Sequence, residues 1–221
     1  MPSLDISDYT GLSSGEVDRR LREEGINVLG LDDAPYDALR PELRAALTEY
    51  YRVDDLHRYD QLVRALGHST HLHGKLDRID SHNEYWLETE ARLRTDFNLY
   101  GIRTDRIATI KRKSAMKEVY RSAGVRVARG SVVRTLEEAR RLVAVTGYPV
   151  VAKPDIGVGA MATYKIRDDG EMARFFLEKP PVDYIVEEFI RGRIFSFDGL
   201  ADRDGRLVFY TAHAYSQGIM E

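Results

Sequence analysis

Cysteine is absent from this sequence of 221 residues. Its absence excludes disulfide bonds and metal sites built on thiolates, and it is compatible with a reducing compartment. The sequence also lacks a long apolar run of the kind that spans a membrane, and its amino terminus is not a basic segment followed by an apolar one. We therefore expect a soluble cytoplasmic protein with no membrane partner.

An excess of charge of one sign is also missing. The chain has 33 lysine and arginine residues against 36 aspartate and glutamate residues, so its net charge is −3. Such a chain has no basic field to attract nucleic acid, and nucleic acid is not expected as a partner. The length permits one large or two small domains with a substantial core. No internal repeat or low-complexity tract is visible.

The first hundred residues alternate between strand and helix patterns. Ser13-Ser14-Gly15-Glu16 has the form of a capping box and predicts a helix to about Glu24. The other expected elements are strands at 26–31, 51–53 and 76–80 and helices at 42–49, 59–66 and 84–97. This alternation predicts a parallel, doubly wound sheet with ligand-binding residues at its carboxyl edge. The first strand is expected to be short or missing, because only Leu4-Asp5-Ile6 precedes a polar stretch.

From Lys111 the pattern changes to α+β. Helices are expected at 114–123, from the Thr135–Glu138 capping box onward, and at 171–177. Extended segments are expected at 127–133, 148–153, 163–166, 184–189, 194–200 and 207–211. The turn Asp202–Gly205 predicts an antiparallel hairpin. The fold class is therefore α/β, with one domain at 1–104 and a second, α+β domain at 105–221.

The segment Tyr148–Ala160 carries the clearest chemical signal. Val150 and Val151 favour a strand that ends in Lys153, and two glycines, Gly157 and Gly159, follow in the next loop. Glycines allow backbone amides to face a bound anion, and the lysine supplies positive charge, as a triphosphate requires. The order differs from the common phosphate motifs, since the lysine precedes the glycines and a strand follows them. The alternative is an ordinary hairpin with an exposed lysine.

Three segments together resemble the ATP-grasp superfamily, the fold of biotin carboxylase, carbamoyl-phosphate synthase and many carboxylate–amine ligases. Lys113 lies where that family has a phosphate-contacting lysine. Lys153 with the following glycines resembles its second lysine and flexible loop, and residues 185–190 resemble its hinge strand. The resemblance covers most of the chain. It implies a Rossmann-like pre-ATP-grasp domain at 1–104 and part of an ATP-grasp domain at 105–221.

The resemblance implies a site for ATP. Lysines would bind the phosphates, the glycine loop would cover them, and the hinge would hold adenine through the backbone of Glu188 and Ile190. Glu187 or Glu188 would accept a hydrogen bond from the base or ribose. The complete set is Lys113, Lys153, Gly157, Gly159, Ala160, Glu187, Glu188, Phe189 and Ile190. Alternatives are a solvated lysine at a helix start for Lys113 and an ordinary strand for the hinge.

The chain departs from the family pattern in two places. Gly192 is followed by Arg193 and Ile194 where many members have a glutamate. The magnesium ligands of the family would lie beyond Glu221, so no metal ligand and no catalytic residue is assigned here. We expect a fragment that binds nucleotide weakly, with little or no turnover.

The intact parent is expected to use ATP and Mg²⁺ to activate a small-molecule carboxylate as an acyl phosphate, which an amine or similar nucleophile then attacks. One alternative is a non-catalytic nucleotide-binding or regulatory subunit, completed by a second chain or by a homodimer. Another is a dinucleotide-dependent protein, although residues 1–100 contain no G-x-G-x-x-G motif.

His68, His71 and His73 form a cluster with spacing that suits a metal. We expect surface histidines in a loop without an acidic partner, rather than a metal site. Trp86 and Leu87 are expected in the core.

Four polar residues complete the candidates. Asn83 is expected to cap a helix, and Glu84 is a candidate ligand contact at the sheet edge. Arg92 and Arg94 either anchor an anionic substrate or belong to a solvated helix face.

Overall fold

The computed structural model describes residues 2–6, 14–81, 83–157 and 161–216. The chain divides into two compact units, Met1–Lys111 and Arg112–Glu221. The domain boundary expected at residue 104 stays a prediction, because compactness alone does not define a domain. No helix within the described ranges is long and apolar enough to cross a membrane.

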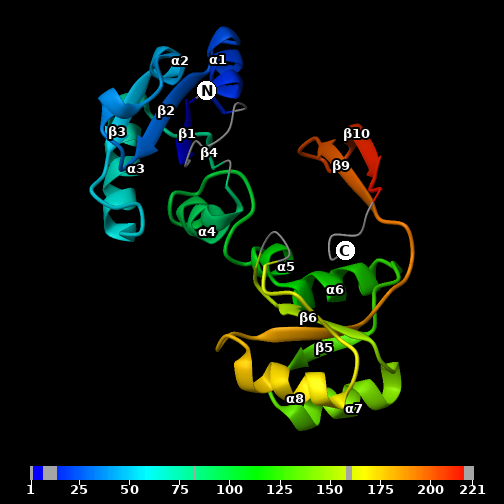
Figure 1. Cartoon of the computed structure of the whole chain (residues 1–221). Coiled ribbons are helices and arrows are strands. Elements are labelled where there is room, and N and C mark those ends of the chain that lie inside the picture. Colours follow the sequence, from blue (N-terminus) through cyan, green and yellow to red (C-terminus); the bar gives the residue numbers. More distant parts are fainter. Residues whose placement is uncertain (1, 7–13, 82, 158–160, 217–221) are drawn as a thin grey trace. The chain divides into compact units, whose positions relative to one another are not determined.

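The first unit contains a four-stranded sheet in the order β3-β2-β1-β4 (Figure 1). Its strands are β1 (Pro2–Ile6), β2 (Asn27–Asp32), β3 (Glu49–Arg52) and β4 (Arg78–Asp80). Every pairing is parallel, as predicted. β1 is short, with five residues, yet it lies between β2 and β4 in the sheet interior.

Helices connect these strands and continue the chain after β4. They are α1 (Ser14–Glu23), α2 (Pro41–Ala46), α3 (Tyr59–His73), α4 (Leu87–Asp96) and α5 (Ala108–Lys111), with 3₁₀ turns at Tyr36–Ala38 and Glu84–Trp86. α3 is longer than expected. Buried Leu66 and Ser69 hold its second half against the unit, and it ends at Gly74, whose φ of 80° favours glycine.

One hydrophobic core fills this unit. Trp86 is buried there, as predicted, and Leu87 is half-buried. The fully buried members of the core that come from the strands and helices include Leu29, Leu31, Leu62, Leu66, Ile79 and Leu93.

The second unit contains an antiparallel sheet in the order β5-β8-β6-β7. Its strands are β5 (Gly130–Val133), β6 (Val150–Pro154), β7 (Tyr164–Ile166) and β8 (Tyr184–Glu188). In the figure, α7 (Leu136–Thr146) and α8 (Asp169–Glu178) lie on one side of this sheet and α6 (Lys113–Ser122) lies on the other (Figure 1).

The two faces of this sheet differ in chemistry because side chains alternate along a strand. Val150, Ala152, Tyr184 and Val186 enter the core beneath α7 and α8. Lys153 and Glu187 therefore project from the opposite face, where α6 lies. The predicted capping box of α7 is present: the Thr135 hydroxyl accepts from the Glu138 amide, and the Glu138 carboxylate accepts from the Thr135 amide.

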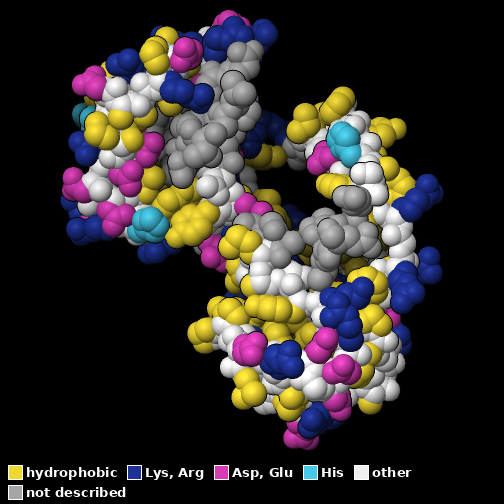
Figure 2. Space-filling model, in the orientation of Figure 1, with side chains coloured by type: hydrophobic (Ala, Val, Ile, Leu, Met, Phe, Trp, Pro, Cys, Tyr) yellow, Lys and Arg dark blue, Asp and Glu magenta, His cyan; other side chains and the backbone are white. Residues whose placement is uncertain are grey.

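A separate hairpin consists of β9 (Phe195–Ala201) and β10 (Leu207–Ala214). The predicted turn is present: Asp202 accepts from two following amides, and Gly205 has a φ of 78°. Large apolar side chains are exposed on this hairpin (Figure 2), among them Phe195, Phe197, Leu200, Val208, Phe209 and Tyr210.

Candidate functional site

Glu187 is the centre of the charged face of the second unit. Its carboxylate is buried, with 4% of the residue exposed. The Lys153 ammonium lies 2.7 Å from Oε2 and the Lys117 ammonium lies 2.6 Å from Oε1. Two of the predicted residues, Lys153 and Glu187, are therefore in direct contact, and the three charges sum to a net positive centre.

One oxygen of this carboxylate retains accepting capacity. Glu187 Oε1 is buried and has no hydrogen-bond partner in the described part of the chain, although Lys117 is close. That contact has the distance of an ion pair without the alignment of a hydrogen bond. The Lys117 ammonium instead donates to the Ala128 carbonyl at 3.1 Å. Buried acceptors normally have an aligned donor, whereas this oxygen has the nearby charge of Lys117 instead.

Sequence reasoning missed Lys117. It lies on α6, one turn after Lys113, so the two lysines share a helix face. The spacing of four residues between Lys113 and Lys117 could have identified Lys117 as a candidate, once α6 was known to lie against the sheet face that carries Lys153.

Asp155 was also missed, and it fixes the start of α6. Its buried carboxylate accepts from the Ser114 amide at 2.8 Å and from the Ser114 hydroxyl at 2.9 Å, and Arg112 lies 3.3 Å away. Its carbonyl accepts from the Lys113 amide at 2.9 Å. This arrangement caps α6 from Asp155, directly after β6, so the start of the helix is fixed to the end of that strand.

Lys113 reaches the glycine loop itself. Its ammonium donates to the Gly157 carbonyl at 2.9 Å. Gly157 does not have a positive φ, and an added Cβ would make only an ordinary contact with Pro154 at 3.4 Å. Its own backbone thus does not require glycine. Gly159 and Ala160 lie outside the described residues.

The hinge residues separate into different roles. Glu188 accepts from the Arg129 amide at 2.8 Å and from its guanidinium at 2.7 Å. These bonds lower the pKa of Glu188. Since Glu188 is already engaged, Glu187 is the better candidate to accept from a base.

The backbone of the hinge is partly free. The amides of Glu188 and Phe189 donate to Arg129 and Pro149. The Ile190 amide has no backbone acceptor among the described residues, and its side chain is 64% exposed. The Phe189 ring lies under the Lys165 ammonium, 4.0 Å from its centroid. Among the described hinge amides, that of Ile190 is therefore available to donate a hydrogen bond to the edge of a base.

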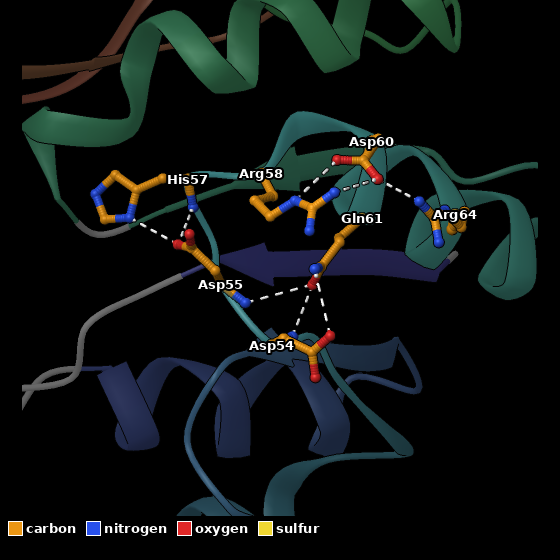
Figure 3. A network of polar contacts seen from close by, with 7 residues as sticks. All are labelled: Asp54, Asp55, His57, Arg58, Asp60, Gln61 and Arg64. Atoms are coloured by element: carbon orange, nitrogen blue, oxygen red, sulfur yellow. Dashed lines mark hydrogen bonds and ion pairs between the residues drawn. The ribbon is translucent and has the colours of Figure 1, made fainter.

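The segment that follows β3, at the carboxyl end of that strand, is internally bonded (Figure 3). Gln61 accepts from the amides of Asp54 and Asp55 at 2.7 and 3.3 Å. Asp55 accepts from the His57 amide at 2.8 Å, a bond that lowers the pKa of Asp55. Arg58 and Arg64 both pair with Asp60. This network holds the start of α3.

Arg94 is not on a solvated helix face, so that alternative is wrong for it. It is 6% exposed and donates to the Ile79 carbonyl, to Asp80 and to Glu90, since α4 packs that side chain against β4. Arg92 lies over the Tyr59 ring at 3.5 Å.

Asn83 caps the turn at Glu84–Trp86, as predicted, by accepting from the Tyr85 amide at 2.9 Å. The side chain of Glu84 is exposed, and its carbonyl accepts from Lys111 at 2.8 Å.

The histidine prediction was wrong in two respects. His68, His71 and His73 lie on α3 rather than in a loop. His68 and His73 also have an acidic partner, Glu49, whose two oxygens they contact separately. Burial alone would raise the pKa of Glu49, but the bonds from His73 and His68 lower it.

Mg²⁺, which the resemblance implies, requires several oxygen ligands. In the ranges that the structure describes, no three histidine, aspartate or glutamate side chains are placed to hold a metal ion. These residues do not form a metal site, and no chemical step is assigned to a metal.

The fold defines the class of protein. Comparison of this mixed α/β chain with solved structures confirms the predicted resemblance to the ATP-grasp fold. The chain superimposes on the biotin carboxylase domain of Hydrogenobacter thermophilus 2-oxoglutarate carboxylase with a TM-score of 0.73 and 21% identity, over 93% of this chain and 48% of that one. An L-amino acid ligase from Bacillus licheniformis gives a TM-score of 0.74 and 15% identity, over 99% and 52%.

Sequence comparison gives particular relatives. The carbamoyl phosphate synthase large chain of Bifidobacterium adolescentis is 28% identical over 199 residues, which are 84% of this chain and 16% of that protein. The protein y4rH of Sinorhizobium fredii, which is uncharacterised, is 30% identical over 193 residues, 82% of this chain and 38% of that one. This chain thus spans less than half of these relatives. No family model matches it.

Proposed function

We propose that the second unit binds the adenine nucleotide of an ATP-grasp ligase. The observation that carries this proposal is the buried Glu187 carboxylate, paired with two lysines and retaining one unsatisfied oxygen. An adenine amine is a donor that suits that oxygen, and Lys153 and Lys113 would contact phosphates.

The complete reaction belongs to the same proposal. A carboxylate would be activated as an acyl phosphate and attacked by an amine or similar nucleophile. The Hydrogenobacter domain was solved with MgADP and bicarbonate, and the Bacillus protein is an amino acid ligase, which supports this reaction class. We infer that residues 1–104 are the Rossmann-like pre-ATP-grasp domain and that residues 105–221 contribute the nucleotide site.

A second copy or a second chain is part of this proposal. The exposed apolar side chains of β9 and β10 support it, since such groups are usually covered in an assembly.

Calorimetric titration of MgATP tests nucleotide binding. Wild type should bind, and Lys153→Ala should abolish measurable binding because the phosphates lose a cation. Lys179→Ala is the matched control. That lysine lies in the same unit, donates to the Pro180 and Val182 carbonyls and lies near the Tyr184 ring. Equal binding by wild type and Lys153→Ala, or no binding by a folded wild type, would contradict the proposal.

A further inference from the structure

Two lysines share Glu187 in unequal ways. Side-chain exposure is 6% for Glu187, 12% for Lys117 and 29% for Lys153. All three are thus held in a poorly hydrated region, where a carboxylate must keep a cationic partner to remain charged at low cost.

Lys117 is the more firmly held of the two lysines. It donates to the Ala128 carbonyl in addition to pairing with Glu187. Its helix is anchored at the other end, where Asp155 caps Ser114. Lys153 has Glu187 as its one partner within the described ranges, and it is the more exposed. Lys153 is therefore the cation that can turn toward a ligand.

Transfer of Lys153 to a phosphate would leave the buried carboxylate with Lys117 alone. Without Lys117, the same movement would strand a buried charge with no partner, a state that proteins strongly disfavour. The geometry thus couples a residue that would not touch the nucleotide to the lysine that would.

We propose that Lys117 is a positioning residue, which keeps Glu187 neutralised so that Lys153 is released to bind phosphate. This inference rests on the proposed function. It assigns different tasks to the two lysines: Lys153 contacts the ligand and Lys117 acts through Glu187.

A double-mutant cycle tests this assignment. The probes are MgADP and inorganic tripolyphosphate, which has no base and so reports on the phosphate subsite even when Glu187 is changed. Lys117→Met should weaken binding of both about tenfold in the wild-type background. In the Glu187→Gln background it should cost at most about threefold, because no buried charge remains to be neutralised. Lys117→Arg should retain binding within about threefold, since it keeps the charge.

Controls separate positioning from stability. Thermal unfolding of each variant reports any loss of fold, and Lys179→Met gives the effect of removing a lysine elsewhere in the unit. Adenosine, which lacks phosphate, should bind Lys117→Met as it binds wild type, because Lys153 need not move.

The outcomes distinguish this inference from the proposed function. If wild type binds but Lys117→Met weakens binding equally in both backgrounds, or not at all, the positioning role is overturned while nucleotide binding stands. If folded wild type binds neither MgADP nor tripolyphosphate, the proposed function is overturned, and this inference with it.

Discussion

Among the described residues, each unit buries a glutamate beside a cationic side chain, and the two differ in what they leave open. Glu90 in the first unit is 1% exposed and accepts from the Ser81 amide and hydroxyl and from Arg94. Glu187 in the second unit is nearly as buried, yet Oε1 has no aligned donor in the described part of the chain.

The cations differ as well. Arg94 is buried and donates to carbonyls of the chain as well as to carboxylates, so its guanidinium is engaged from several sides. The lysines beside Glu187 are single-point cations, and Lys153 is partly exposed. A closed network of this kind stabilises a fold, whereas the open one is where we propose that a ligand binds. The comparison teaches that satisfaction of hydrogen bonds, rather than burial, separates these two roles.

The largest expected effect is on the closed network. Arg94→Met should lower the free energy of unfolding by about 3–5 kcal/mol, because it strands the buried Glu90 carboxylate. Chemical denaturation monitored by circular dichroism measures this change. Lys117→Met, the matched substitution in the second unit, should cost less, since Lys153 still pairs with Glu187. Equal losses of the free energy of unfolding in Arg94→Met and Lys117→Met would contradict the difference drawn between the two networks.

The next largest effect on stability is expected from substituting one of two glycines, one in each unit. Gly101 has a φ of 131°, and an added Cβ would lie 2.8 Å from the Arg94 side chain. Gly101→Ala should therefore destabilise the first unit by about 1–3 kcal/mol. Gly157→Ala should change stability by no more than about 0.5 kcal/mol, and its effect should fall on MgATP affinity.

Thermal unfolding and calorimetry of the two glycine variants check this contrast. A Gly157→Ala protein that loses stability while keeping its affinity would mean that this glycine serves the fold.

The pH dependence of stability should have opposite signs for one glutamate in each unit, Glu90 and Glu188. Burial raises the pKa of Glu90, whereas bonds from Arg129 lower the pKa of Glu188. Because the pKa of Glu90 is raised in the folded state, ionising this carboxyl destabilises the fold. The stability that protonated Glu90 contributes is lost as pH rises through the folded pKa. A lowered folded pKa makes Glu188 stabilising above its unfolded pKa, and that contribution is lost as pH falls through the folded value.

The stability difference between wild type and Glu188→Gln should therefore shrink as the solution is acidified below about pH 4.5. Side-chain NMR titration measures both pKa values directly. A Glu188 pKa above its ordinary value would contradict the Arg129 assignment.

Much of the fold follows from local patterns in the sequence. The Thr135–Glu138 capping box and the Asp202–Gly205 turn are each set by residues close in the chain, and each was predicted correctly. β1 was hard to predict because its place in the sheet depends on pairing with β2 and β4 rather than on an apolar run.

The site was predictable only in part, for a similar reason. Lys153 and Glu187 were candidates from the sequence because they lie in strands with recognisable patterns. Lys117 and Asp155 were missed because their roles arise from contacts between segments distant in the chain. The same holds for Glu49, whose partners lie on α3.

The most direct test compares neighbouring glutamates. MgATP is titrated by calorimetry into wild type, Glu187→Gln and Glu188→Gln under identical conditions. Glu187→Gln should weaken MgATP binding about tenfold or more, because the substitution replaces a charged acceptor by a neutral amide. The affinity of Glu188→Gln should stay within about threefold of wild type. Unchanged affinity in Glu187→Gln, or an equal or larger loss in Glu188→Gln, would contradict the claim that Glu187 is the open centre of the site.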